Sequence, residues 1–90
     1  NPAVGALWAT VLEEWVARTA AAIEAERRRG AAPPGPPARQ LATALNLMNE
    51  RVLYAAFSGE APAVAEAEVV EVLLDVWLCG VYRSAVVPLA

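Results

Sequence analysis

Large aromatic side chains recur along one face of the first part of the sequence. Trp8, Leu12, Trp15 and Thr19 follow one another at steps of four, three and four residues, so on a helix they form a single stripe. A stripe of this kind can form the aromatic wall of a ligand pocket, but it can equally be ordinary core packing. From the spacing alone we favour core packing.

Two amide side chains stand out on an otherwise apolar segment. Asn46 and Asn49 are three residues apart, and the only charges between Arg39 and Glu60 are Glu50 and Arg51. Both amides are expected to be substantially buried, where an amide without a hydrogen-bond partner costs about 1–3 kcal/mol. The partners can be backbone, water or each other, or they can belong to a ligand in an apolar cavity. The residues alone leave these two explanations equally open.

Other reactive groups are scarce. Histidine is absent and Cys79 is the single cysteine, which leaves no residue set for a zinc site, a Cys-His dyad, a Ser-His-Asp triad or a disulfide framework. Most carboxylates belong to solvated helix faces, and their spacing indicates no acid and base pair. We therefore expect no catalytic residue, no metal site and no cofactor, in a protein that is not an enzyme.

One basic cluster, Arg27-Arg28-Arg29, interrupts an acidic composition. All seven basic residues are arginine, ten residues are acidic, and the net charge is −3. Cations suit the C-terminal end of a helix, where each contributes about 0.3–1 kcal/mol. We favour this explanation over phosphate binding. Since the chain has no overall basic field, it is not expected to bind DNA by itself.

The elements that position these residues are predicted to be three helices in one small domain of 90 residues. Apolar spacing of three and four residues predicts helices over about 2–29, 38–58 and 65–83. Asn1 and Pro2 suit a helix start, and residues 30–37, with four prolines and two glycines, exclude helix. The third segment is rich in valine, but the spacing of its acidic residues favours helix, and residues 84–90 are expected to be a frayed end. The fold class is all-α, with three antiparallel helices.

The surface of these helices predicts a partner. The segment 38–58 is apolar over most of its circumference, which predicts burial on two sides. We expect a homodimer in which segments 38–58 and 65–83 form a four-helix bundle with the same two segments of the partner. Val52 is expected to face the partner. No uncharged apolar run reaches the roughly 18–20 residues that span a bilayer, and the start resembles no signal peptide. We expect no membrane association, a cytoplasmic location and a fragment of a longer protein.

The run LATALNLMNER at residues 41–51, followed by Leu53, Gly59 and Glu60, resembles the penultimate helix of TetR-family transcriptional regulators. Residues upstream, among them Trp8, Trp15 and Thr19, resemble the preceding helix, and Val69, Leu73, Trp77 and Tyr82 resemble the last one. The resemblance covers nearly all of residues 4–83. It implies the C-terminal effector-binding and dimerisation part of a repressor, without the N-terminal helix-turn-helix domain.

The resemblance also implies a ligand site. In the family member that these segments resemble, the ligand lies in a long channel lined by aromatic residues. The implied ligand-binding residues here are Trp8, Leu12, Trp15, Thr19, Asn46, Asn49, Leu53, Tyr54 and Trp77. Leu12 and Tyr54 replace a methionine and a phenylalanine. The implied function is binding of a small elongated hydrophobic effector that releases the parent protein from operator DNA, which only the absent N-terminal domain would contact. The alternative is a helical dimerisation or interaction module without a ligand.

Overall fold

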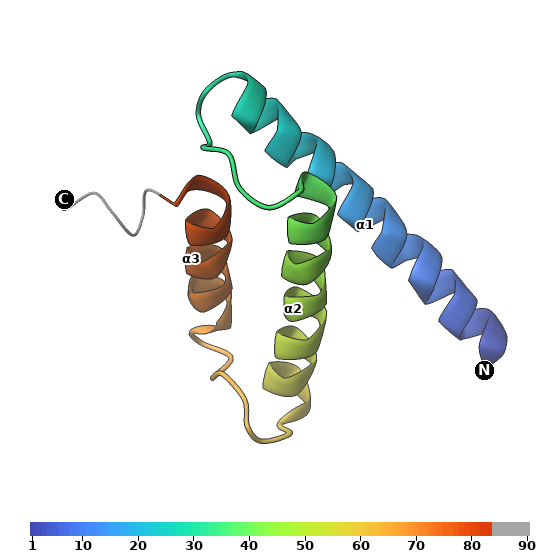
Figure 1. Cartoon of the computed structure of the whole chain (residues 1–90). Helices are drawn as coiled ribbons and strands as arrows, with labels where there is room; N and C mark the ends of the chain where they lie inside the picture. Colours follow the sequence, from blue (N-terminus) through green and yellow to red (C-terminus); the bar gives the residue numbers. More distant parts are fainter. Residues whose placement is uncertain (84–90) are drawn as a thin grey trace.

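The structure is a computed structural model that describes residues 1–83 as three α-helices joined by two loops (Figure 1). Helix α1 spans Pro2–Arg28, α2 spans Ala38–Ser58 and α3 spans Val69–Tyr82. Successive helices run in opposite directions, and residues 1–83 contain no strand. The predicted all-α fold with three antiparallel helices is confirmed. The frayed end expected at residues 84–90 lies outside the described part of the chain.

Local chemistry sets both ends of α1. The Asn1 side chain accepts a hydrogen bond of 2.8 Å from the backbone N–H of Ala3, and Pro2 occupies the first helical position. This arrangement satisfies a donor that the first turn leaves without a partner. At the other end Arg27 and Arg28 lie in the last turn, where cations offset the negative end of the helix dipole.

Prolines and glycines set the ends of α2. Residues 33, 34, 36 and 37 are all proline, so the chain between α1 and α2 cannot be helical. Helix α2 starts directly after Pro37 and ends at Gly59, whose φ of 76° lies in the left-handed region that glycine adopts at little cost. The backbone N–H of Gly59 bonds to the carbonyl of Ala55 at 3.0 Å.

The third helix is shorter than predicted, because it starts at Val69 and not near Ala65. Residues 66–68 form a turn in which the N–H of Glu68 bonds to the carbonyl of Ala65 at 2.9 Å. Glu68 is the N-cap residue and its side chain makes no capping hydrogen bond. The start is fixed instead by packing, since Val69 is fully buried against α2.

Helix α2 lies between α1 and α3 (Figure 1), and the core consists of two clusters along it. The first joins α1, the first half of α2 and the end of α3, and its buried members are Val16, Ile23, Ala32, Ala38, Ala42, Leu45 and Val81. The second joins the last turns of α2 to the start of α3 through Ala56, Val69 and Leu73. Val52, which is predicted to face a partner, is half-buried and packs against this second cluster.

Much apolar surface stays exposed despite this core. On α3, Val72 and Val76 are exposed on one flank, and Val70, Leu74 and Leu78 are exposed on another. On α1 every residue from 1 to 10 is exposed, Val4 and Leu7 among them. None of the helices within residues 1–83 is long and apolar enough to cross a membrane.

Candidate functional site

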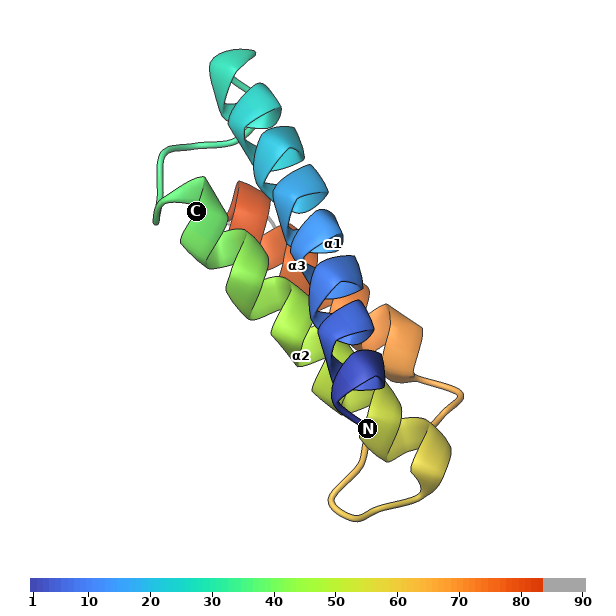
Figure 2. The same cartoon turned by 90° about the vertical axis from the view of Figure 1, so that its right-hand side faces the viewer.

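One hollow in this surface lies between the first half of α1 and the second half of α2. It has a volume of about 820 Å³ and is lined by Trp8, Glu50, Arg51, Leu53, Tyr54, Phe57 and Ser58. The side view shows α1 lying across the face of α2 (Figure 2). We call this hollow the Trp8 groove. It brings together three of the predicted ligand residues, namely Trp8, Leu53 and Tyr54.

Polar contacts hold the rings of the Trp8 groove. The indole N–H of Trp8 donates a hydrogen bond to the Glu50 carboxylate, which connects α1 to α2. The Arg51 guanidinium lies 5.6 Å from the centre of the Tyr54 ring, a cation–π distance. Trp8 remains 49% exposed. The groove is therefore an open aromatic surface with a charged rim.

A second, smaller groove of about 240 Å³ lies between the second half of α1 and α3. We call it the Trp77 groove. Its walls are almost entirely apolar, and its lining residues are Thr19, Ala22, Ile23, Glu26, Leu74, Trp77, Leu78, Val81 and Tyr82. Two further predicted ligand residues, Thr19 and Trp77, therefore lie here and not in the Trp8 groove.

Asn46 and Asn49 connect α2 to residues of the Trp77 groove. The amide nitrogen of Asn46 donates to the Thr19 hydroxyl at 3.1 Å and to the carbonyl of Ala42 at 2.8 Å. The indole N–H of Trp77 donates to the amide oxygen of Asn49 at 2.8 Å. Both asparagines are half-buried, which is less than expected. Their partners are side chains of the neighbouring helices together with backbone, and they do not bond to each other.

Leu12 and Trp15 line neither groove. Leu12 is half-buried and Trp15 is 53% exposed. The Arg18 guanidinium lies 5.4 Å from the centre of the Trp15 ring. The predicted stripe on α1 is thus divided in the structure, since Trp8 lines one groove, Thr19 lines the other, and the two residues between them line none.

Several groove residues were absent from the sequence-based set. Phe57 lines the Trp8 groove four residues after Leu53, so helical spacing could have indicated it. Glu50 also lines the Trp8 groove and accepts the Trp8 hydrogen bond. Glu26 and Tyr82 are 56 residues apart in sequence and meet only in the fold, so no local pattern indicated them.

Glu26 and Tyr82 form a polar end to the Trp77 groove. The Tyr82 hydroxyl donates to Glu26 Oε1 at 2.5 Å, and Arg29 donates to both oxygens of the same carboxylate at 2.6 and 2.9 Å. These bonds, the one from Arg29 first, lower the pKa of Glu26, while its carboxylate raises the pKa of the Tyr82 phenol. At neutral pH a charged carboxylate therefore joins α1 to the end of α3.

The chemistry of the described residues contains no assembled metal site. Within residues 1–83 no group of three or more His, Cys, Asp or Glu side chains could hold a metal ion. Cys79 is a half-buried free thiol. The two grooves and the amides beside them offer apolar area and hydrogen-bonding groups for binding.

Comparison with known proteins places this all-helical unit, with its aromatic grooves and half-buried amides, in the class of C-terminal domains of transcriptional regulators. Residues 1–83 match the family described as "Transcriptional regulator EthR, C-terminal domain", and the chain belongs to this family. The resemblance to TetR-family regulators is thereby confirmed.

Two relatives show the extent of the similarity. HTH-type transcriptional regulator EthR of Mycobacterium tuberculosis strain H37Rv is 56% identical over 79 residues, which are 88% of this chain and 37% of that protein. Its counterpart in Mycolicibacterium smegmatis is 48% identical over 84 residues, which are 93% of this chain and 39% of that protein. The chain thus spans less than two fifths of the length of these curated relatives.

Proposed function

We propose that the chain is the effector-binding and dimerisation portion of a TetR-type transcriptional repressor, and that its effector is a small, elongated, hydrophobic molecule. The observation that carries the proposal is the pair of apolar grooves, of about 820 and 240 Å³, with the Asn46–Asn49 pair beside them. Pockets for small molecules have volumes of roughly 300–1,000 Å³ and combine apolar walls with a few placed polar groups. The Trp8 groove lies within this range, and the Trp77 groove is smaller.

The aromatic and amide side chains are assigned different roles in binding the effector. Trp8, Tyr54 and Trp77 supply aromatic area, which favours burial of an apolar chain. Within residues 1–83 the amide oxygen of Asn46 and the amide nitrogen of Asn49 form no hydrogen bond. These two atoms are the groups that we assign to orienting the effector, which should carry at least one hydrogen-bond acceptor.

The effector acts by shifting an equilibrium between two states of the parent protein. A ligand that binds one spacing of the DNA-binding domains more tightly than the other lowers operator affinity by the same coupling factor. We assign operator contact to the part of the parent protein outside this chain, and action on chromosomal DNA places the parent in the cytoplasm. The chain itself contributes the effector half of the coupling.

The Asn46→Leu and Asn49→Leu variants test the ligand site in the intact parent protein. We expect each to weaken binding of a hexadecyl amide probe at least tenfold, equivalent to about 1.4 kcal/mol, because a placed amide is lost. The measurement is a titration followed by tryptophan fluorescence. Gln40→Leu is the matched control, since Gln40 is an exposed amide on the same helix. Its affinity should stay within twofold of the parent.

An unchanged affinity in both asparagine variants, with higher stability, would contradict the role of the two amides as ligand contacts. An unchanged parent protein that does not bind the probe would favour the alternative of a helical dimerisation module. One observation supports that alternative. Both asparagines already have partners inside the chain, Thr19 for Asn46 and Trp77 for Asn49, so their presence does not require a ligand. Binding of the probe and probe-dependent release of operator DNA by the unchanged parent protein would support the effector-binding function over the dimerisation module.

DNA binding by the isolated chain is expected to be absent. Its net charge is −3, and Arg29 of the only basic cluster is paired with Glu26, so no broad positive surface is available for phosphates. A mobility-shift titration of the chain should show no sequence-selective complex at salt concentrations where the intact parent binds a palindromic operator. A salt-dependent, sequence-selective complex with the chain alone would contradict the assignment.

A further inference from the structure

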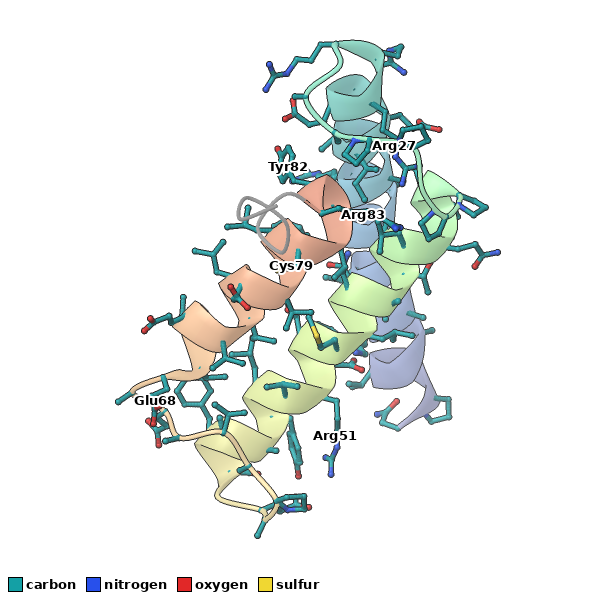
Figure 3. All side chains as sticks on the ribbon, turned by 60° about the vertical axis from the view of Figure 1, so that its left-hand side comes forward. Arg27, Arg51, Glu68, Cys79, Tyr82 and Arg83 are labelled. Atoms are coloured by element: carbon teal, nitrogen blue, oxygen red, sulfur yellow. The ribbon has the colours of Figure 1, made fainter. Side chains whose placement is uncertain are left out.

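The Trp77 groove ends at a polar pair formed by Glu26 of α1 and Tyr82 of α3. Figure 3 shows Tyr82 in the last turn of α3, beside the end of α1. Its hydroxyl donates to Glu26 Oε1 at 2.5 Å. The groove has a volume of about 240 Å³, which is below the roughly 300 Å³ at which pockets for whole ligands begin. It therefore has room for one end of a ligand, and the polar pair lies where that end stops.

The remaining hydrogen-bonding capacity of this pair consists of acceptors. An ionised carboxylate has about four acceptor sites, and that of Glu26 uses three of them, one for Tyr82 and two for Arg29. The Tyr82 hydroxyl donates its single hydrogen to Glu26, and within residues 1–83 its oxygen accepts no hydrogen bond. Since the hydrogen bond to Glu26 raises the pKa of the Tyr82 phenol, the phenol keeps this hydrogen at neutral pH. The pair therefore offers acceptors to a ligand and no free donor.

Charge selects among the groups that can donate to the pair. Arg29 balances the charge of Glu26 through an ion pair at 2.6 Å, and the Glu26 side chain is only 23% exposed. An ammonium group would place a second cation beside Arg29, and like charges at such short distances repel. An uncharged hydroxyl group donates one hydrogen and adds no charge. The arrangement therefore suits a hydroxyl group better than an amine.

The distance between the polar pair and the asparagine pair sets the length of the chain. Thr19 and Glu26 line the groove two turns apart on α1, so roughly 10 Å of helix separates them at 1.5 Å per residue. The Thr19 hydroxyl accepts from Asn46 at 3.1 Å. A chain of about eight methylene groups spans this distance at a C–C bond length of about 1.5 Å. One unbranched chain can therefore place an amide group beside the asparagines and its far end at Glu26.

We propose that Glu26 and Tyr82 bind a terminal hydroxyl group of the effector, whose unbranched apolar chain lies in the Trp77 groove. The inference rests on the proposed function and narrows its effector to an aliphatic alcohol. A hydroxyl group that enters an apolar groove loses its hydrogen bonds to water, which is unfavourable unless the protein supplies a partner. Glu26 and Tyr82 supply this partner, and the apolar walls, Leu74 and Leu78 among them, favour burial of the methylene chain.

Two amides that differ in one group test the site in the intact parent protein. One is N-octyldecanamide, and the other carries a hydroxyl group in place of the terminal methyl group of the decanoyl chain. A titration followed by tryptophan fluorescence gives the ratio of their affinities. Glu26→Leu combined with Tyr82→Phe removes the acceptors of the pair at similar side-chain volume, so we expect this ratio to shift at least tenfold toward the methyl compound.

Glu24→Leu is the matched control, since Glu24 is an exposed carboxylate on the same helix. Its affinity ratio should stay within twofold of the parent. NMR spectra of isotope-labelled tyrosine in the unchanged parent give a second readout that requires no variant to fold. The Tyr82 ring signal should shift more with the hydroxyl compound than with the methyl compound, because only the hydroxyl group contacts the phenol oxygen.

The outcomes separate this inference from the function on which it rests. An equal affinity ratio in the parent and in the double variant, which circular dichroism shows to keep its helices, would overturn the inference while the proposed function stands. A Tyr82 signal that responds equally to both compounds, or an equal shift of the ratio in Glu24→Leu, would overturn it as well. A parent protein that binds neither amide would contradict the proposed function, and the inference would fall with it.

Discussion

The Ile23→Ala variant is expected to lose about 2–4 kcal/mol of its free energy of unfolding. Ile23 is 2% exposed and lies in the cluster that joins α1, α2 and the end of α3. Removing its side chain deletes buried apolar surface and leaves a cavity, which is the combination that makes such changes costly. Since domains of this size are stable by roughly 5–15 kcal/mol, the loss is a large share of the total.

Urea unfolding followed by far-ultraviolet circular dichroism, at one fixed protein concentration, measures this loss. The control is Leu7→Ala, because Leu7 lies on the same helix and is 65% exposed. Its free energy of unfolding should change by less than about 0.5 kcal/mol. Equal losses in the two variants would show that the cluster around Ile23 is not the core of the fold.

The Val76→Asp variant is expected to weaken dimer formation at least a hundredfold, about 2.7 kcal/mol. We propose the homodimer through α2 and α3, and Val72 and Val76 form an exposed apolar flank of α3 that lies outside the Trp77 groove. A twofold axis places each residue in the interface twice. Two unpaired carboxylates in an apolar contact are strongly unfavourable.

Equilibrium sedimentation at micromolar concentration measures the association. Val70→Asp is the matched control, since it makes the same change on another flank of the same helix, at a residue that is 70% exposed. The Val70→Asp variant should remain a dimer. A stable monomer of the unchanged chain would contradict the dimer itself, whereas a persistent Val76→Asp dimer would move the interface to another face.

The sequence predicts the ends of helices best where backbone chemistry decides them. Asn1 caps α1 with its side chain and Gly59 ends α2 in the left-handed region. Asparagine is a favoured residue at a helix start and glycine at a helix end, so both roles can be predicted from the sequence. The predicted start of the third helix near Ala65 is too early, because residues 66–68 form a turn and Val69 is the first helical residue. Packing of Val69 decides the boundary, and this packing involves Ala56 of α2, which is 13 residues away in sequence.

The candidate site is harder to derive from the sequence, because its residues are assembled by the register between helices. The spacing identifies Asn46 and Asn49 as amides that need partners, but it cannot select Thr19 and Trp77, which are 27 and 28 residues away. For the same reason, the sequence could not show that Trp8 and Thr19 line different grooves. They share one face of α1, yet they line different grooves because α2 and α3 cover different lengths of that face.

The long first helix has a mechanical consequence. Its buried residues, Val16 and Ile23, lie in its second half, while residues 1–10 are all exposed. Pro2 is 14 residues from Val16, or about 21 Å along the axis at 1.5 Å per residue. A tilt of about 5° around Val16 therefore moves Pro2 by about 2 Å. The first half of α1 thus projects from the core, and the Trp8 groove lies along this projecting half, so a small change in the tilt of α1 would change the width of the groove.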